Sequence, residues 1–161
     1  MKYIITERQS RLLEEPEKVL KIPSLKYFNN DWDLLQNFLE NRGYPPYSIS
    51  GDLDLYKVPI KSLGNLKRVE GYLNLYKTPI KTLGKLKHVE GYLYLSRTQI
   101  KSLGNLEYVG GYLGLPNTPI KSLGNLKHVG GDLYLESTPL SETTSEDEIR
   151  SKVNVEFDIY L

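Results

Sequence analysis

Leucine, isoleucine and valine recur along residues 51–140 in a pattern that repeats every 20 residues. Complete units occupy 51–70, 71–90, 91–110 and 111–130 without insertion, and a fifth begins at 131–140. From the second unit to the first residue of the third, the recurring positions are Leu73, Leu75, Ile80, Leu83, Gly84, Leu86, Val89 and Gly91. A short fixed period predicts a solenoid in which each unit forms one coil, because a single unit cannot bury its own leucines.

The apolar spacing changes within each unit. The Leu-x-Leu step at Leu73 and Leu75 predicts a strand with both leucines on one face, whereas the three-residue steps up to Val89 favour a tight turn or a short 3₁₀-like segment. Stacked units would align five or six strands in a parallel sheet. A proline without an N–H ends each strand, at Pro59, Pro79, Pro119 and Pro139, and Gln99 replaces it once.

The segment from Val69 to Leu83, VEGYLNLYKTPIKTL, resembles the L-x-x-L-x-L-x-x-N-x-L signature of leucine-rich repeats, and the resemblance extends over roughly 90 residues. It implies an α/β repeat fold, a short leucine-rich-repeat solenoid. The step before Leu73 is one residue longer than in the family. Threonine occupies the usual asparagine position, as Thr78, Thr98, Thr118 and Thr138, and Val58 occupies it in the first unit.

A threonine hydroxyl can bond the turn backbone of its own or the next coil, so a threonine column is an adequate substitute for asparagine. The period of 20 leaves no room for a helix in the return, which predicts a flat solenoid. The units are also similar to short repeat proteins of bacteria and large phages.

The segments flanking the repeats differ from them, as expected of terminal caps in one domain of residues 1–161. The N-terminal cap, 1–48, is expected to be helical. Residues 2–6 predict a short strand, Thr6 with Gln9 caps a helix to about Glu15, and Pro16 interrupts the chain after that helix. A second helix, from Trp32 to Asn41, would begin at Asn30 or Asp31, bury Trp32, Leu35, Phe38 and Leu39, and end at Gly43.

The leucine-rich repeats would then cover 49–140 and the C-terminal cap 141–161. Ser145 with Glu148 predicts a helix of about 146–152, and the last nine residues alternate like one strand that closes the sheet. Its core-facing set would be Val153, Val155, Phe157, Ile159 and Leu161. We expect a monomer, and the alternative is a homodimer paired through this strand.

Positions between the strand leucines point to the open, concave face of the predicted sheet and carry most of the tyrosines. Tyrosine combines a large contact area with a polar group, and interfaces are enriched in it, although it also favours strands for packing alone. We predict a protein-binding surface made by Tyr56, Tyr72, Asn74, Tyr76, Tyr92, Tyr94, Arg97, Tyr112 and Tyr134.

Charge is unevenly distributed although the formal net charge is only +1. Residues 51–140 carry twelve Lys and Arg against seven Asp and Glu, and residues 141–161 carry two against six. The recurring Lys61, Lys81, Lys101 and Lys121 form a basic stripe that could bind phosphate. Lysines at the edges of a flat solenoid also keep it soluble, which explains the same stripe without a ligand. Nucleic-acid binding is therefore a lesser alternative to protein binding.

Catalysis and cofactors have little support in the sequence. There is no cysteine, and the two histidines, His88 and His128, are two coils and about 9 to 10 Å apart, too far to share a metal. Phosphate-loop and dinucleotide motifs are missing, and no base is placed to join Asp52 and Asp54. We therefore expect no enzyme, no catalytic residue, no cofactor and no metal site.

The leading interpretation is a protein-binding module, as an inhibitor or adaptor, and the alternative is a structural or assembly component, for example of a phage, that uses its edges. No apolar run is long enough to span a membrane, and the polar start MKYIITERQS does not resemble a signal peptide. We expect a cytoplasmic location, in the host cytoplasm if the protein is viral.

Overall fold

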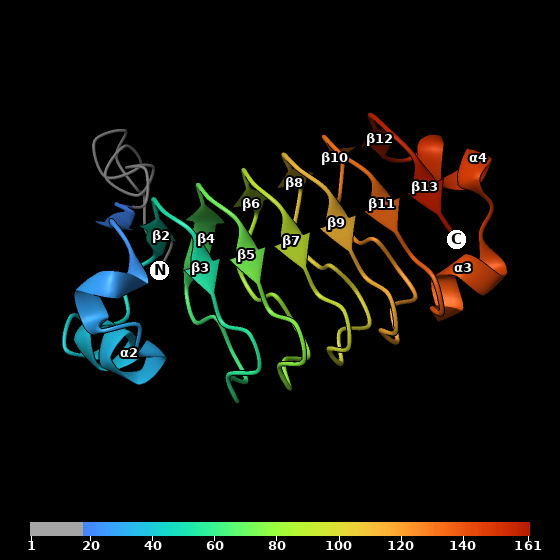
Figure 1. Cartoon of the computed structure of the whole chain (residues 1–161). Coiled ribbons are helices and arrows are strands. Elements are labelled where there is room, and N and C mark those ends of the chain that lie inside the picture. The colour runs from blue at the N-terminus through green and yellow to red at the C-terminus, as the bar shows by residue number, and fades with distance from the viewer. Residues whose placement is uncertain (1–17) are drawn as a thin grey trace, which may run out of the picture.

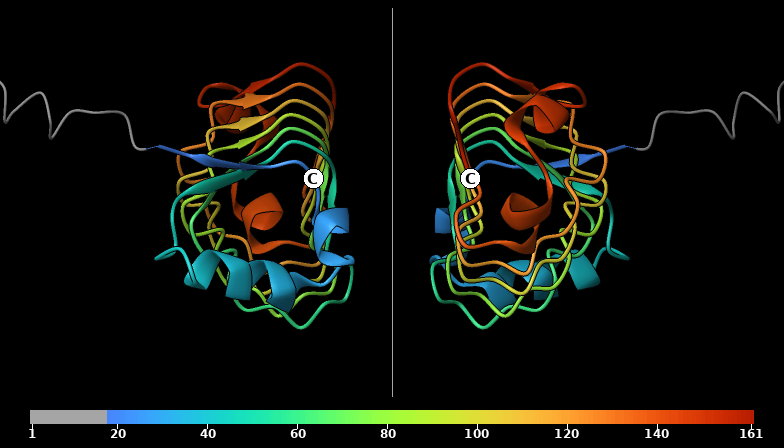
Figure 2. Two further views of the ribbon diagram at one scale, coloured as in Figure 1. Left: turned by 90° about the vertical axis from the view of Figure 1, so that its left-hand side faces the viewer. Right: turned by 90° about the vertical axis from the view of Figure 1, so that its right-hand side faces the viewer.

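The computed structural model describes residues 18–161, which form a parallel β-solenoid of about four turns with two parallel sheets (Figures 1 and 2). The strand expected at 2–6 and the helix from Thr6 to about Glu15 lie outside these residues. Viewed along the solenoid axis, successive coils lie over one another, so equivalent positions form columns (Figure 2). The repeat and the solenoid predicted from the 20-residue period are confirmed.

Sheet B, our name for the sheet in front in Figure 1, is the one predicted from the Leu-x-Leu step. Neighbouring strands of the repeats pair residues that are 20 positions apart in the sequence. Leu73, for example, pairs with Leu53 on one side and with Leu93 on the other. From one edge to the other, its six parallel strands are β13 (Ile159–Tyr160), β11 (Leu133–Tyr134), β9 (Leu113–Gly114), β7 (Leu93–Tyr94), β5 (Leu73–Asn74) and β3 (Leu53–Asp54).

Sheet A, the second sheet, was not predicted, because the return of each coil was expected to hold only a turn or a 3₁₀-like segment. From β4 onward its strands bury one valine per coil, as at Val89, and turn the preceding side chain outward, as at His88. The seven parallel strands are β1 (Leu20–Ile22), β2 (Tyr47–Ile49), β4 (Leu66–Val69), β6 (His88–Val89), β8 (Tyr108–Val109), β10 (His128–Val129) and β12 (Asn154–Val155).

The core is a stack of leucine, isoleucine and valine columns enclosed by the two sheets and their connections. No helix interrupts 51–138, as the short period predicted. The threonine column is buried, and the hydroxyls of Thr78, Thr118 and Thr138 donate to the carbonyl oxygens of Leu75, Leu115 and Leu135, at 2.7 to 2.9 Å. The hydroxyl therefore bonds the turn of its own coil.

Residues 18–48 bring one helix against the first coil. In α2 (Trp32–Glu40), Asp31 accepts hydrogen bonds from the Asp33 and Leu34 N–H groups at the N-terminus, one of the two caps expected. Trp32, Leu35 and Leu39 are buried and Phe38 is partly buried, as the apolar spacing predicted. The helix is preceded by the 3₁₀ helix η1 (Leu25–Phe28) and followed by β2, whose Tyr47 hydroxyl donates to the Leu63 carbonyl oxygen at 2.8 Å.

The C-terminal segment forms a last, longer coil. It contains α3 (Pro139–Thr143), which was not predicted, and α4 (Glu146–Arg150), where Ser145 accepts from the Glu148 N–H as expected. The prediction of one strand over 153–161 is wrong, because the chain bends from β12 in sheet A to β13 in sheet B. The bend places Phe157 outside, 61% exposed, and Leu161 is 45% exposed, although both were expected in the core.

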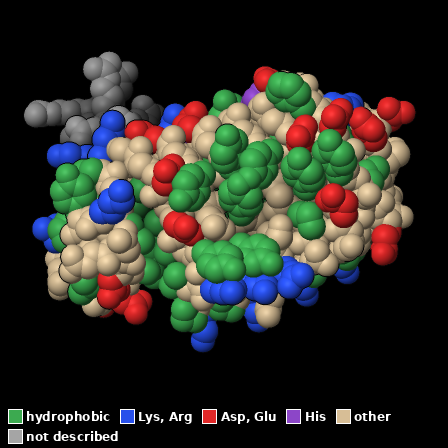
Figure 3. Space-filling view, viewed as in Figure 1, with side chains coloured by type: hydrophobic (Ala, Val, Ile, Leu, Met, Phe, Trp, Pro, Cys, Tyr) green, Lys and Arg blue, Asp and Glu red, His purple; other side chains and the backbone are tan. Residues whose placement is uncertain are grey.

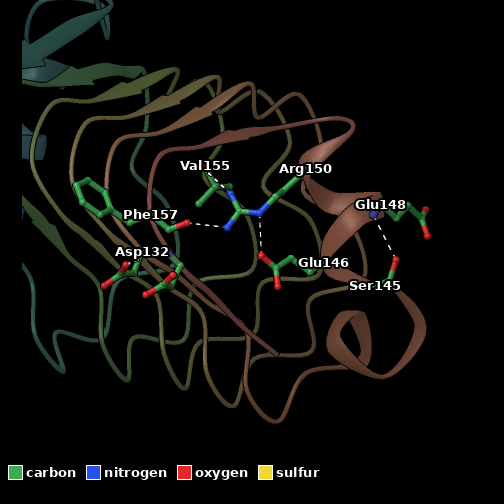
Figure 4. Close-up of polar contacts among 8 residues, drawn as sticks. Asp132, Ser145, Glu146, Glu148, Arg150, Val155 and Phe157 are labelled. Atoms are coloured by element: carbon green, nitrogen blue, oxygen red, sulfur yellow. Dashed lines mark hydrogen bonds and ion pairs between the residues drawn. The ribbon is translucent and has the colours of Figure 1, made fainter.

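Arg150 fixes this bend (Figure 4). Its guanidinium donates to the carbonyl oxygens of Val155 at 2.8 Å and Phe157 at 2.7 Å, and its third hydrogen bond reaches Glu146 at 2.8 Å. The side chain thus joins helix α4 to the corner between the two sheets. Between residues 18 and 161, none of the helices is long and apolar enough to cross a membrane.

Candidate functional site

The predicted tyrosines lie on the outer face of sheet B, which we call the tyrosine face. It comprises Tyr56, Tyr72, Tyr76, Tyr92, Tyr94, Tyr112, Tyr134 and Tyr160. The leucines that alternate with them are completely buried, for example Leu93 and Leu95 on either side of Tyr94. Hydrophobic side chains, which include tyrosine, accordingly gather over the strands of sheet B in Figure 3.

Five of these rings form one continuous cluster. Tyr92 stacks on Tyr112 with ring centroids 4.4 Å apart, and Tyr94 stands edge-on to Tyr112 at 5.0 Å. The cluster continues from Tyr112 to Tyr134 at 6.0 Å and from Tyr134 to Tyr160 at 4.8 Å. Gly114, in the strand between Tyr94 and Tyr134, has no side chain, which leaves space for the rings on either side.

The remaining predicted residues lie beside this cluster. Tyr56 and Tyr76 form a separate stacked pair, 5.4 Å apart, on neighbouring coils. Asn74 accepts a hydrogen bond from the Tyr76 N–H at 3.1 Å, so its side chain shapes the turn that follows β5. Arg97 is exposed in the equivalent turn of the next coil, with a positive φ of 60°. Tyr72 makes no ring contact within the described residues.

Several phenols on this face keep their proton to higher pH than an ordinary tyrosine. Burial raises the pKa of Tyr94, and Tyr92 raises it further. For Tyr72 burial is again the main cause of a raised pKa, followed by the charges of Asp54 and Asp52. At neutral pH these groups are uncharged and can both donate and accept hydrogen bonds.

The acidic end of the face affects two further phenols. The pKa of Tyr134 is raised chiefly by the hydrogen bond that its hydroxyl donates to Asp132, at 3.0 Å. The pKa of Tyr160 is raised first by the charge of Asp158 and then by that of Asp132. The tyrosine cluster therefore ends in an acidic group beside the last coil.

A shallow hollow adjoins the cluster and was not predicted from the sequence. It is lined by the glycine pairs at the corner between the sheets and by Tyr92, Tyr112, Asp132 and Phe157. The lining glycines are Gly110, Gly111, Gly130 and Gly131. The sequence feature that could have predicted the hollow is the pair of glycines after the valine of these two coils, because the pair removes two side chains from the corner. Phe157 could not be included in such a prediction, because it was expected in the core.

A second column of rings lies on sheet A. Tyr108 stacks on His128 at 4.8 Å and contacts His88 at 6.1 Å, so an aromatic ring separates the histidines. His128 also lies 3.6 Å from Glu156 and 3.2 Å from Asn154. Within residues 18–161 no group of three or more metal-ligating side chains is assembled.

Comparison of the chain with protein-family models, curated proteins and solved structures finds no match. The resemblance to leucine-rich repeats therefore stays a prediction. The surface columns of this chain are the remaining guide to its function.

Proposed function

We propose that this protein is a protein-binding module whose partner lies across the tyrosine face. The observation that carries the proposal is the continuous ring cluster from Tyr92 to Tyr160, whose rings are partly or largely exposed on the outer face of sheet B. Tyr92 is 47% exposed and Tyr160 is 41% exposed. Because the rings already support one another, few rotamers would be lost on binding, which favours affinity.

The shape of the surface supports a macromolecular partner. The tyrosine face is open, and the glycine-lined hollow beside Tyr112 is shallow, so a small molecule would leave most of its surface in water. A protein side chain inserted between Tyr92 and Phe157 would instead be covered by the rest of its own chain. Neutral phenol hydroxyls around the hollow can satisfy polar groups of that partner.

In the same proposal the flanking segments are terminal caps of a leucine-rich-repeat-like solenoid. Helix α2 packs beside the first coil, and α3 and α4 lie at the opposite end of the solenoid (Figure 1). Buried Trp32, Leu140 and Ile149 come from these helices and join the common core. This arrangement leaves the sheet face between the caps as the broad open surface.

Alanine substitution distinguishes the tyrosine face from the rest of the solenoid. We expect the triple variant Tyr92→Ala, Tyr94→Ala and Tyr112→Ala to weaken partner binding at least about tenfold, because interface energy concentrates in central aromatic residues. The matched control removes the ring column of sheet A, with His88→Ala, Tyr108→Ala and His128→Ala, and should bind normally. Isothermal titration with the isolated partner measures both, after circular dichroism has shown that both are folded. Equal affinity of the triple variant and the parent protein would reject the proposal.

A second candidate function is assembly through the last coil. Phe157, Tyr160 and Leu161 are exposed beside β13, the edge strand of sheet B, and an edge strand can pair with a second copy. Asp158 opposes this pairing, since two copies would bring like charges together. Sedimentation would show a dimer that is lost on deleting 153–161 if this second function is correct, and a monomer at all concentrations if it is wrong.

A further inference from the structure

Eight positive charges without an accompanying acid occupy the greater part of the four connections that lead from sheet B to sheet A within the repeats. The segments concerned are residues 55–66, 75–86, 95–106 and 115–126, and they contain no Asp or Glu. All eight basic residues are exposed: Lys57, Lys61, Lys77, Lys81, Lys85, Arg97, Lys101 and Lys121. The repeats therefore carry their acids in the strands or within two residues of them, and their excess of positive charge on one side of the solenoid.

Four of these residues, Lys61, Lys81, Lys101 and Lys121, form a regular column that we call the lysine row. Backbone bonds hold its members on adjacent coils, since the Lys121 N–H donates to the Lys101 carbonyl oxygen at 2.9 Å. The next residues, Ser102 and Ser122, form a parallel bridge. At a coil spacing of about 4.8 Å the row spans roughly 14 Å.

Among residues 18–161 the lysine row has no acidic partner. The ion pairs in this part of the chain involve other cations, such as Arg68 with Glu90 and Lys87 with Glu107, which lie in or next to the strands of sheet A. The repeat fixes the spacing of the lysine backbones, and their ammonium groups, which carry like charges on adjacent coils, repel one another. A polymer with regular negative charges would relieve this repulsion along the whole row.

We propose that the lysine row binds the phosphate backbone of single-stranded nucleic acid. The neighbouring turns favour this polymer over an acidic polypeptide, because they add aromatic rings to the charges. Lys57 lies 4.8 Å from the ring centre of Tyr56, and Lys77 lies 5.4 Å from that of Tyr76. Cations that follow a backbone next to exposed rings are the arrangement by which proteins bind single strands without sequence preference.

The lysine row lies on the connections, apart from the five-ring cluster, and shares only Tyr56 and Tyr76 with the tyrosine face. The net charge of +1 gives little long-range attraction, so affinity must come from local contacts with the row. For single strands the logarithm of affinity falls with that of salt concentration, with a slope of about 0.7 per phosphate contacted. Four contacts predict roughly fifty-fold weaker binding between 50 and 200 mM NaCl.

Fluorescence anisotropy of a labelled 20-nucleotide oligothymidylate with the full chain tests the proposal. We expect saturable binding at 50 mM NaCl, and at least about tenfold weaker binding by the variant Lys61→Gln, Lys81→Gln, Lys101→Gln and Lys121→Gln. The control Lys21→Gln, Lys26→Gln, Lys87→Gln and Lys152→Gln changes the net charge equally but leaves the row intact. It should bind within about threefold of the parent protein, and thermal unfolding verifies that both variants are folded.

Three results would overturn the proposal. The first is absence of binding by the parent protein at 50 mM NaCl. The second is an equal loss in the two quadruple variants, which would assign any binding to net charge alone. The third is competition by polyglutamate, or by a duplex of the same length, as effective as that by unlabelled oligothymidylate, since the site would then recognise negative charge without preferring a single strand.

Discussion

At the scale of single residues, close contact between coils explains why glycine recurs at the corner between the sheets. A Cβ added to Gly131 would lie 2.7 Å from the Tyr112 nitrogen and 2.9 Å from the Gly111 carbonyl carbon. Gly91 is equally restricted, with the Tyr72 nitrogen at 2.8 Å. These neighbours are backbone atoms that cannot rotate away, so the corner requires glycine for the space it saves.

The variant Gly131→Ala should therefore be destabilised by about 1 to 3 kcal/mol, the usual cost of overpacking. Gly114→Ala is the control, because its nearest neighbour would be the Ser96 hydroxyl oxygen at 3.7 Å. Alanine there should keep or slightly raise stability, since glycine within a strand costs about 0.5 to 1 kcal/mol. Urea unfolding measures both variants, and similar midpoints would contradict the close packing of the corner.

The threonine column offers a second test with an internal control. The Thr118 hydroxyl donates to the Leu115 carbonyl oxygen at 2.7 Å, whereas the equally buried Thr98 hydroxyl has no partner among the described residues. Thr118→Val should cost about 1 kcal/mol and Thr98→Val should be neutral or stabilising, because only the first loses a hydrogen bond. Differential scanning calorimetry would contradict this if Thr98→Val were the more damaging change.

At the scale of elements, sheet B could be predicted from the sequence and sheet A could not. In sheet B each strand of the repeats is marked by two buried leucines separated by one outward residue, as at Leu73 and Leu75. This alternation distinguishes a strand from a turn. The strand at His88 and Val89 buries a single residue, so its pattern is also that of a turn. The sequence feature that could have indicated a strand here is residue type rather than alternation. A β-branched valine directly follows an aromatic or long side chain in each coil of the repeats, and β-branched and aromatic residues favour strands.

In the last coil, too, the local sequence pattern was not enough to predict the structure. The alternation in 153–161 predicted one strand, but a coil must turn a corner between the two sheets, and only three-dimensional closure reveals where. Arg150 fixes that corner through the Val155 and Phe157 carbonyl oxygens. An exposed arginine in a short helix gave no indication of this role in the sequence.

Arg150→Gln should loosen the last coil while the others remain intact. The Leu133 and Leu135 N–H groups donate to the Asp158 and Tyr160 carbonyl oxygens, so their hydrogen exchange reports how firmly this coil is docked. We expect exchange at least about tenfold faster at these two amides, since a hydrogen bond to a charged group is worth about 1.5 to 3 kcal/mol.

Two internal references accompany the exchange experiment. Lys152→Gln removes only the exposed ion pair with Glu148 and should not change exchange. The amides of Leu113 and Leu115, which bond the coil before the last, should stay protected in both variants. Unchanged protection of Leu133 in Arg150→Gln would show that the bend does not depend on this arginine.

At the scale of the whole molecule, the coils share their core and differ on their surface. The tyrosine columns were predicted because alternation decides which residues face outward. The contacts between the rings, the shallow hollow and the outward Phe157 were not, because they depend on coil stacking and on the final bend. The candidate functions therefore lie in the surface columns: rings on sheet B, and positive charges on the connections.

The most direct test of the central claim is site-specific photo-crosslinking in the cells that make the protein. A photoreactive phenylalanine replaces Tyr94, at the middle of the tyrosine face, or Tyr108, in the ring column of sheet A. Our account predicts one discrete adduct from position 94 and none from position 108. The absence of an adduct from position 94, or the same adducts from both positions, would contradict a binding surface on sheet B.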